Sequence, residues 1–281
     1  MNLQSKIRYL RNSLYCLPWK VFAKTKIYKD NTLPIKFVSE DADWAIKTVG
    51  ENIKKGIDLI KPNQFEITTD PSRIIKKIVH FGSQYMWLNW GKYMAKENLY
   101  ITSFFHGKPE DGEDVKIHID LFLDSVKRLK KVVTASTLIE KRLLGWGVPK
   151  EKLVKIPLGV NTKLFNLPLD FEKDSIRKSL GISKHFIVIG SFQKDGSGWK
   201  DGLNPKLIKG PDLFVSTLKL LLSRGYPVFA LLTGPARGYV KKELKKCGIP
   251  NLFIHELGNQ KFTRKKYGMD STGIIELVKK L

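Results

Sequence analysis

The chain has 281 residues, and its 50 Lys and Arg exceed its 27 Asp and Glu to give a formal net charge of +23. A hydrophobic fraction of 42% excludes a disordered chain, and two cysteines exclude a disulfide framework and favour a reducing compartment. No apolar run reaches the roughly 18–20 residues of a membrane-spanning helix. The charge favours anionic partners without choosing among nucleic acid, anionic lipid and phosphorylated small molecules.

The first 30 residues form a basic extension, in which no acidic residue precedes position 30. Basic residues alternate there with leucines and aromatics, and we expect Pro18 to split the segment into two short pieces. Two interpretations stay open. The segment is either an amphipathic helix on an anionic membrane or a helix packed on the domain with its charged side in water.

Strand-like and helix-like patterns then alternate as far as residue 160. The pattern predicts helices over 43–60, 115–129 and 137–146. The predicted strands are 35–41, 65–70, 76–83, 99–107, 131–136 and 153–160.

The alternation breaks near residue 168 and then starts again. Strands are predicted over 185–191, 227–235 and 251–256, with helices over 211–224 and from about 236 to 247. The chain is therefore predicted to be an α/β protein with two Rossmann-like parallel-sheet domains, residues 1–168 and 169–281.

Open parallel sheets bind ligands beyond the carboxyl ends of their strands, so the loops at those ends are the candidate sites. The loop of residues 192–209 is rich in glycine and lysine, and Arg237 follows the next predicted strand. Both would suit phosphate, although neither matches a Walker or Rossmann fingerprint. The alternative for both is an ordinary solvated loop.

His106 follows an apolar strand and precedes Gly107. A lone histidine in such a place is more often a core residue than a functional one, and both interpretations stay open. The other histidines lack metal-ligand spacing and the two cysteines do not form a zinc motif, so no metal site is predicted.

Three stretches resemble a known family. VVTASTLIEKRLLGWGVPKEKLVKIPLGVNTKLF resembles the hinge-proximal signature of retaining GT-B glycosyltransferases of group 1, which are family 4-like. IVIGSFQKDG followed by LIKGPDLF is similar to the opening of their donor domain, and FALLTGPARG to its second strand. The resemblance covers about residues 99–250.

The resemblance implies a GT-B fold and a glycosyltransferase that moves a sugar, with retention, from a UDP- or GDP-linked donor to a glycan or lipid-linked acceptor. It implies polysaccharide biosynthesis in the cytoplasm, without a cofactor or a metal ion. If the basic extension is the membrane-binding helix of the first interpretation, we expect it to contact the inner face of the membrane. The chain carries no recognisable nucleic-acid-binding motif.

Site residues follow from the resemblance. Lys209 and Gly210 match the Lys-Gly motif whose cation would contact the donor diphosphate, and Gly190 matches the glycine that lets the donor approach the backbone. Where the family has Arg after this glycine, the chain has Ser191, and Lys194 is the nearest cation to replace it. Arg237 completes the donor-binding set.

The family's pair of glutamates, seven residues apart, has no counterpart. The glutamates after residue 234 are Glu243, Glu256 and Glu276. We therefore expect an incomplete donor domain in a truncated chain.

On the acceptor side, His106 matches the family's catalytic histidine, which faces the donor sugar. Asp41 and Trp44 are candidate acceptor contacts, and Tyr85, Trp87 and Trp90 are aromatics that either stack on sugars or belong to the core. Two alternatives to a working transferase remain: an inactive fragment of such an enzyme, or a non-catalytic protein that binds nucleic acid or anionic membranes.

Overall fold

The computed structural model describes residues 3–25, 34–41, 45–162, 165, 167, 169–198 and 200–254. The chain divides into two compact units, Met1–Val160 and Asn161–Leu281, whereas the sequence placed the boundary near residue 168. None of the described helices is long and apolar enough to cross a membrane.

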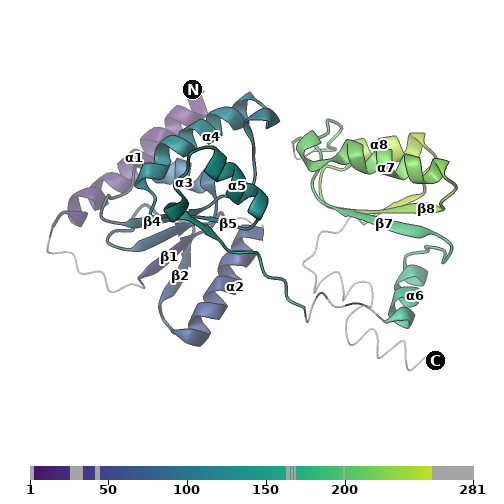
Figure 1. Ribbon diagram of the computed structural model, residues 1–281, viewed down its shortest axis with the longest axis horizontal. Helices are drawn as coiled ribbons and strands as arrows, with labels where there is room; N and C mark the ends of the chain where they lie inside the picture. The colour runs from purple at the N-terminus through teal and green to yellow at the C-terminus, as the bar shows by residue number, and fades with distance from the viewer. Residues whose placement is uncertain are drawn as a thin grey trace. The chain divides into compact units, whose positions relative to one another are not determined.

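Unit 1 is built on a six-stranded sheet in the order β2-β1-β3-β4-β5-β6, in which every neighbouring pair is parallel (Figure 1). The strand order reverses between β1 and β3, which is where open sheets of this kind form a crevice. The strands are β1 (Ile35–Val38), β2 (Phe65–Thr68), β3 (Ile78–Phe81), β4 (Leu99–Ser103), β5 (Lys131–Thr134) and β6 (Leu153–Lys155). The helices are α1 (Leu3–Ala23), α2 (Ala45–Ile60), α3 (Gln84–Trp90), α4 (Glu113–Ser125) and α5 (Thr137–Gly145).

An aromatic cluster fills the core of unit 1. The ring of Trp87 lies 5.6 Å from that of Phe81 and 5.2 Å from that of Tyr100, and its Nε1 donates to Ser125 Oγ at 2.7 Å. Trp87 is only 1% exposed, and Trp90 packs against the same cluster. Trp87 is therefore a core residue and is not placed to stack on a sugar, whereas Trp90 is only partly buried.

The first helix differs from the prediction, because α1 runs unbroken through Pro18. A proline inside a helix removes one N–H donor, which leaves the carbonyl of Leu14 without its helical partner. Leu14 is 65% exposed, so this side of the helix is open to water that can satisfy the carbonyl. The helix can therefore continue.

Unit 2 carries a three-stranded parallel sheet in the order β7-β8-β9. In Figure 1, α7 and α8 cover one face of this sheet. Its apolar core includes Val215 and Leu218 of α7 and Val240 and Leu244 of α8. The elements are α6 (Asp170–Ser179), β7 (Ile187–Phe192), α7 (Pro211–Ser223), β8 (Val228–Thr233), α8 (Gly238–Lys246) and β9 (Asn251–Phe253). The predicted α/β class with two parallel sheets is confirmed.

The core histidine of unit 1 is His80 in β3. Its ring lies 5.1 Å from that of Phe37, and its Nε2 lies 3.0 Å from Ser103 Oγ. Burial lowers the pKa of His80 from the ordinary 6.5 to about 4, so the imidazole is neutral at pH 7.

This burial makes the stability of the protein sensitive to acid. The folded pKa of His80 lies below the unfolded value, so its contribution to the free energy of unfolding is lost as the pH falls from about 6.5 to about 4. The loss is at most about 3 kcal/mol. In urea unfolding at several pH values, we expect His80→Gln to lose less stability than the wild type across this window. Parallel pH profiles of the two proteins would contradict the assignment.

Candidate functional site

The start of α7 combines a lysine, a left-handed glycine cap and a helix amino end. Lys209 is exposed at the end of a short 3-10 helix, Leu207–Lys209, and directly precedes the helix. Gly210 caps α7 at φ 66° and ψ 35°, a left-handed conformation that disfavours other residues. Pro211 occupies the first position, where a missing N–H costs nothing. A lysine thus stands beside the positive end of the helix dipole.

Hydrogen bonds within the loop hold Lys209 in place. The side-chain amide of Gln193 donates to the carbonyl of Lys209 at 2.8 Å. The backbone N–H of Lys206 donates to the carbonyl of Asp195 at 2.7 Å, and Gly196 and Pro205 form an antiparallel bridge. The described residues of the segment 193–210, which are all but residue 199, therefore form a hydrogen-bonded lobe that follows β7.

Glycines let this lobe approach the turn between β8 and α8. A Cβ on Gly234 would lie 2.6 Å from the carbonyl oxygen of Gln193, and a Cβ on Gly202 would overlap the carbonyl of Ala236. The N–H of Gly238 donates to the carbonyl of Asp201 at 2.6 Å. Larger side chains at these glycines would push the two loops apart.

Arg237 does not lie where the sequence analysis expected it. The residue is only 2% exposed. Its Nη1 donates to the carbonyl of Gln193 at 2.6 Å, and its Nη2 donates to Ser191 Oγ at 2.8 Å. Because the guanidinium is buried and hydrogen-bonded to Ser191 and Gln193, Arg237 stabilises the start of the lobe and is not exposed to a ligand. The expectation that it contacts the donor is corrected on this point.

Asp195 is the ionic partner of Arg237. Arg237 Nη1 lies 3.3 Å from Asp195 Oδ2, and both side chains are buried. Burial raises the pKa of Asp195, while the charge of Arg237 opposes that shift. Burial likewise lowers the pKa of Arg237, opposed by the Asp195 carboxylate. Among the described residues, no residue other than Asp195 itself donates a hydrogen bond to the Asp195 carboxylate oxygens, so the arginine charge is their main compensation.

Two further lysines of the lobe lie near each other. Partial desolvation lowers the pKa of Lys194, and the positive charge of Lys206 lowers it further. Such like-charge proximity is relieved when an anion binds. Lys194, which the sequence proposed as the replacement for the family's arginine, thus lies in a cationic part of the lobe.

Gly190 and Ser191 both lie inside β7, as the predicted strand over 185–191 implies. Gly190 lies inside β7, paired with Leu231, and not beyond the strand end, since β7 extends to Phe192. Ser191 is 8% exposed and bonded to Arg237, so its hydroxyl is part of the internal support. The strand end is shifted because Phe192 still pairs with Thr233 of β8.

In unit 1, His106 lies just beyond β4 and is exposed, so the core-histidine interpretation is wrong. The Gln84 side chain donates to the carbonyl of His106 at 3.1 Å, and Arg142 donates to that of Gly107 at 3.2 Å. Gly107 has φ 111°. The turn that presents His106 is therefore fixed from two sides.

Tyr85 lies between two histidines. Its ring stacks on that of His118 at 4.0 Å and lies 6.1 Å from that of His106. Burial lowers the pKa of His118, and the charge of His106 lowers it further. At 38% exposed, Tyr85 is more accessible to ligands in water than Trp87 or Trp90.

The remaining acceptor candidates follow β1. Asp41 is exposed, two residues after Ser39, whose N–H donates to the carbonyl of Thr68 at 3.0 Å. Trp44 lies outside the described residues. Asp41 therefore stands near the carboxyl end of the strand at which the sheet order reverses.

Comparison with known proteins shows the fold. Crystal structures of HepE from Anabaena are similar to this chain. The complex with UDP and glucose has a TM-score of 0.55 at 14% identity, over 79% of this chain and 70% of HepE. The complexes with UDP-glucose and with UDP both have a TM-score of 0.52, at 13% and 12% identity, over 79% of this chain and 69% and 70% of HepE. No protein-family model and no curated protein matches the chain.

The fold is that of the GT-B glycosyltransferases. In such open sheets, ligands are expected at the carboxyl ends of strands, where the lobe of residues 193–210 and the His106 turn both lie.

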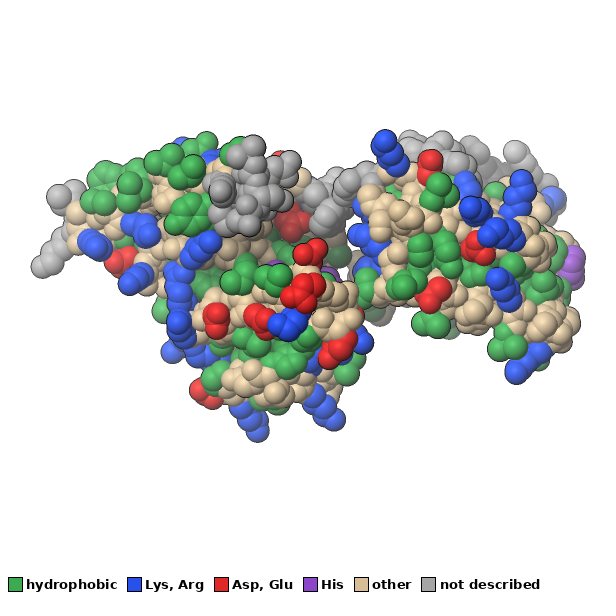
Figure 2. Space-filling view, turned by 90° about the horizontal axis from the view of Figure 1, so that it is seen from above, with side chains coloured by type: hydrophobic (Ala, Val, Ile, Leu, Met, Phe, Trp, Pro, Cys, Tyr) green, Lys and Arg blue, Asp and Glu red, His purple; other side chains and the backbone are tan. Residues whose placement is uncertain are grey.

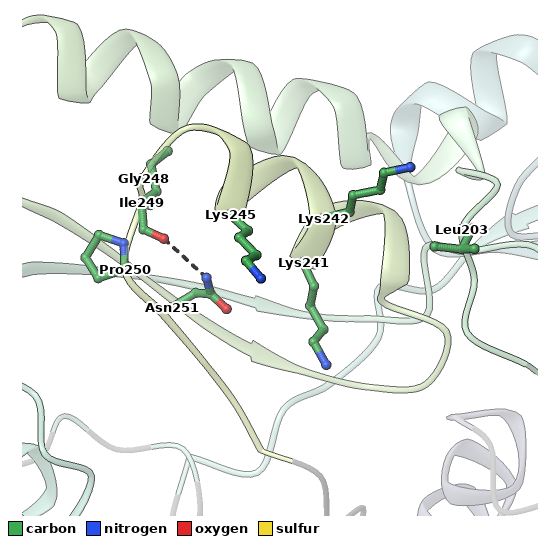
Figure 3. A pocket seen from close by; sticks show the side chains of 8 residues that line it. All are labelled: Leu203, Lys241, Lys242, Lys245, Gly248, Ile249, Pro250 and Asn251. Atoms are coloured by element: carbon green, nitrogen blue, oxygen red, sulfur yellow. Dashed lines mark hydrogen bonds between the residues drawn. The ribbon is translucent and has the colours of Figure 1, made fainter.

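A shallow hollow of about 640 Å³ lies elsewhere on unit 2 (Figure 3). Figure 3 shows Lys241 and Lys245 projecting on the same side of α8 as Asn251, while Lys242 points toward Leu203. Most of its lining belongs to α8 and to the turn that leads into the amino end of β9. We do not assign the donor to it, because ligands of parallel sheets bind at the opposite strand ends.

Gln193 and Asp195 were not predicted from the sequence. Gln193 connects Arg237 to Lys209, while Asp195 pairs with Arg237 and accepts, at its backbone carbonyl, from the N–H of Lys206. A signal for Asp195 was present. It is an acidic residue within a lysine-rich loop, and an arginine follows the neighbouring strand. Nothing in the local sequence indicates the hydrogen bond of Gln193.

Proposed function

We propose that this protein transfers a sugar from a UDP- or GDP-linked donor to an acceptor, with retention of configuration. The observation that carries the proposal is the exposed Lys209 at the amino end of α7, held there by Gln193 and Arg237. It occurs in a fold shared with HepE, whose crystal structures hold UDP and UDP-glucose.

The chemistry requires stabilisation of the leaving group. As the bond between the anomeric carbon and the diphosphate oxygen breaks, negative charge grows on the nucleoside diphosphate. A lysine ammonium group and the free N–H groups of a helix start are suited to that charge, and their fixed positions avoid the cost of reorganising during the reaction. Lys194 and Lys206 would add to the positive potential around the phosphates.

On unit 1, we assign the donor-sugar contact to His106. The hydrogen bonds from Gln84 and Arg142 to its turn support this role, because a catalytic contact needs a fixed position. Asp41, Trp44 and Tyr85 are the proposed acceptor contacts, and the acceptor is a glycan or a lipid-linked saccharide of cytoplasmic polysaccharide synthesis.

His106→Ala separates chemistry from binding. We expect turnover, followed as release of UDP or GDP from the nucleotide-sugar, to fall by roughly 10²-fold, while the affinity for the free nucleotide changes less than about twofold. The matched control is His185→Ala on unit 2, where the ring lies 2.8 Å from the hydroxyl of the exposed Ser183. Unchanged turnover in His106→Ala would remove His106 from the proposed mechanism.

Titration calorimetry with a panel of UDP- and GDP-sugars tests the proposed function. At least one nucleotide-sugar should bind with a dissociation constant below the millimolar range, and nuclear magnetic resonance of the product should show the donor's anomeric configuration. If no member of the panel binds at millimolar concentration, the chain is not a working transferase. An inverted product would refute retention alone.

A further inference from the structure

The first helix presents a continuous apolar stripe to the solvent. Ile7, Leu10, Leu14, Leu17 and Val21 are 57%, 60%, 65%, 56% and 60% exposed. They follow one another at alternating intervals of three and four residues, which places them on one side of the helix. A continuous row of exposed large apolar side chains marks an interaction surface, so we expect a binding partner to cover the stripe.

The helix already packs on unit 1 through its other side. Asn12, Cys16 and Ala23 are buried, and the side-chain amide of Asn12 donates to the carbonyl of Asn89 at 3.0 Å. Trp19 and Ala23 of α1 pack in a small apolar cluster with Ile75 and Ala95 of unit 1. The residues that dock α1 are therefore not those of the apolar stripe.

Positive charge surrounds the stripe. Residues 3–23 include no Asp or Glu, and Arg11 and Lys20 lie on either side of the apolar row, with Lys24 following the helix. Figure 2 looks onto the side of unit 1 that carries α1 and shows hydrophobic side chains gathered there, with Lys and Arg beside them. An apolar stripe flanked by cations is suited to the interface of a lipid bilayer, where apolar acyl chains lie beneath anionic headgroups.

The spacing of the stripe would also fit a coiled coil with a second copy of α1, but the charges oppose this. If the stripe filled the a and d positions, Arg11 and Lys20 would occupy e and g positions. No acidic residue in the helix could pair with them, so two copies would place like charges together. Anionic lipid headgroups would instead neutralise every one of these cations.

We propose that α1 binds in the interfacial region of an anionic lipid bilayer. Its leucine stripe enters the boundary of the acyl chains, and Arg11, Lys20 and Lys24 contact the headgroups. The proposal does not depend on sugar transfer, and vesicle binding tests it separately.

The full chain is tested by cosedimentation with vesicles of phosphatidylcholine alone and of phosphatidylcholine with one third phosphatidylglycerol. The wild type should bind the anionic vesicles and bind the neutral vesicles at least tenfold more weakly. Leu14→Glu with Leu17→Glu should lower binding to anionic vesicles at least tenfold. The matched control, Leu59→Glu with Ile60→Glu on α2, changes residues that are 88% and 87% exposed and should bind like the wild type.

Further variants separate the contributions. Arg11→Gln with Lys20→Gln should weaken binding several-fold and reduce its dependence on salt. Leu14→Ser with Leu17→Ser adds no charge and should also weaken binding. Circular dichroism should show the wild-type helix content in all variants, since the changed side chains on the stripe are exposed.

Three results would overturn the proposal. Absence of binding to either kind of vesicle would do so. Equal binding by the wild type and both leucine double variants would assign the attraction to the net charge of the whole chain. A wild-type dimer in light scattering that Leu14→Ser with Leu17→Ser dissociates, without vesicle binding, would assign the stripe to a second copy of the chain.

Discussion

Lys209→Ala should weaken the binding of the nucleoside diphosphate about 10- to 100-fold. A charge-assisted contact to phosphate contributes about 1.5–3 kcal/mol, and the exposed lysine at the start of α7 is placed to make one. Titration calorimetry with UDP or GDP measures the effect, and Lys209→Arg should restore part of the affinity.

Lys219→Ala is the matched control for this prediction, because it removes the same charge from the exposed side of the same helix, away from its first turn. We expect its effect on affinity to be less than about twofold, as for a surface charge remote from the ligand. Equal losses in the two variants would show that only the total charge matters, and the assignment of Lys209 would then be wrong.

Arg237→Ala should destabilise unit 2 by about 3–5 kcal/mol, because it leaves the buried Asp195 carboxylate without the arginine charge that pairs with it. It should also abolish measurable nucleotide binding, since the carbonyl of Gln193 loses its donor and the support of Lys209 is lost. Amide hydrogen exchange in β7 and β8 reports the stability of the unit.

The double variant Arg237→Met with Asp195→Leu distinguishes support from ligand contact. Removing both charges should recover most of the stability that Arg237→Ala loses. If Arg237→Ala left hydrogen exchange unchanged and lowered only nucleotide affinity, Arg237 would be a direct phosphate contact, contrary to its place in the structure.

The strands were the most predictable part of the fold. Each strand in the described part of the chain lies within or next to a run predicted from its apolar residues, because a strand buried on both faces leaves a continuous apolar signal. Two helices were missed. The seven residues of α3 are too few for a helical period, although Ser83 Oγ accepts from the N–H of Met86 as a helix cap would. The residues of α6 are mostly polar and give no clear apolar period. The helix start is marked instead by the carboxylate of Glu172, which accepts from the N–H of Leu169.

The site was predictable only in part. The position of Lys209 and Gly210 at a helix start could be predicted, because the motif specifies both the cation and the helix that follows it, while their contact with a donor stays a prediction. The internal role of Arg237 could not, because its partners Ser191, Gln193 and Asp195 lie on another strand and loop, and local sequence carries no information on burial. The exposure of His106 likewise depends on how its turn is held by Gln84 and Arg142.

Hydrogen exchange of the full chain, with and without saturating UDP or GDP, tests the central claim most directly. The account predicts slower amide exchange in the lobe of residues 193–210 and the first turn of α7, with smaller changes elsewhere in unit 2. Protection confined to the hollow beside Lys241 and Lys245, or no protection anywhere in unit 2, would contradict the assignment of the lobe as the diphosphate site.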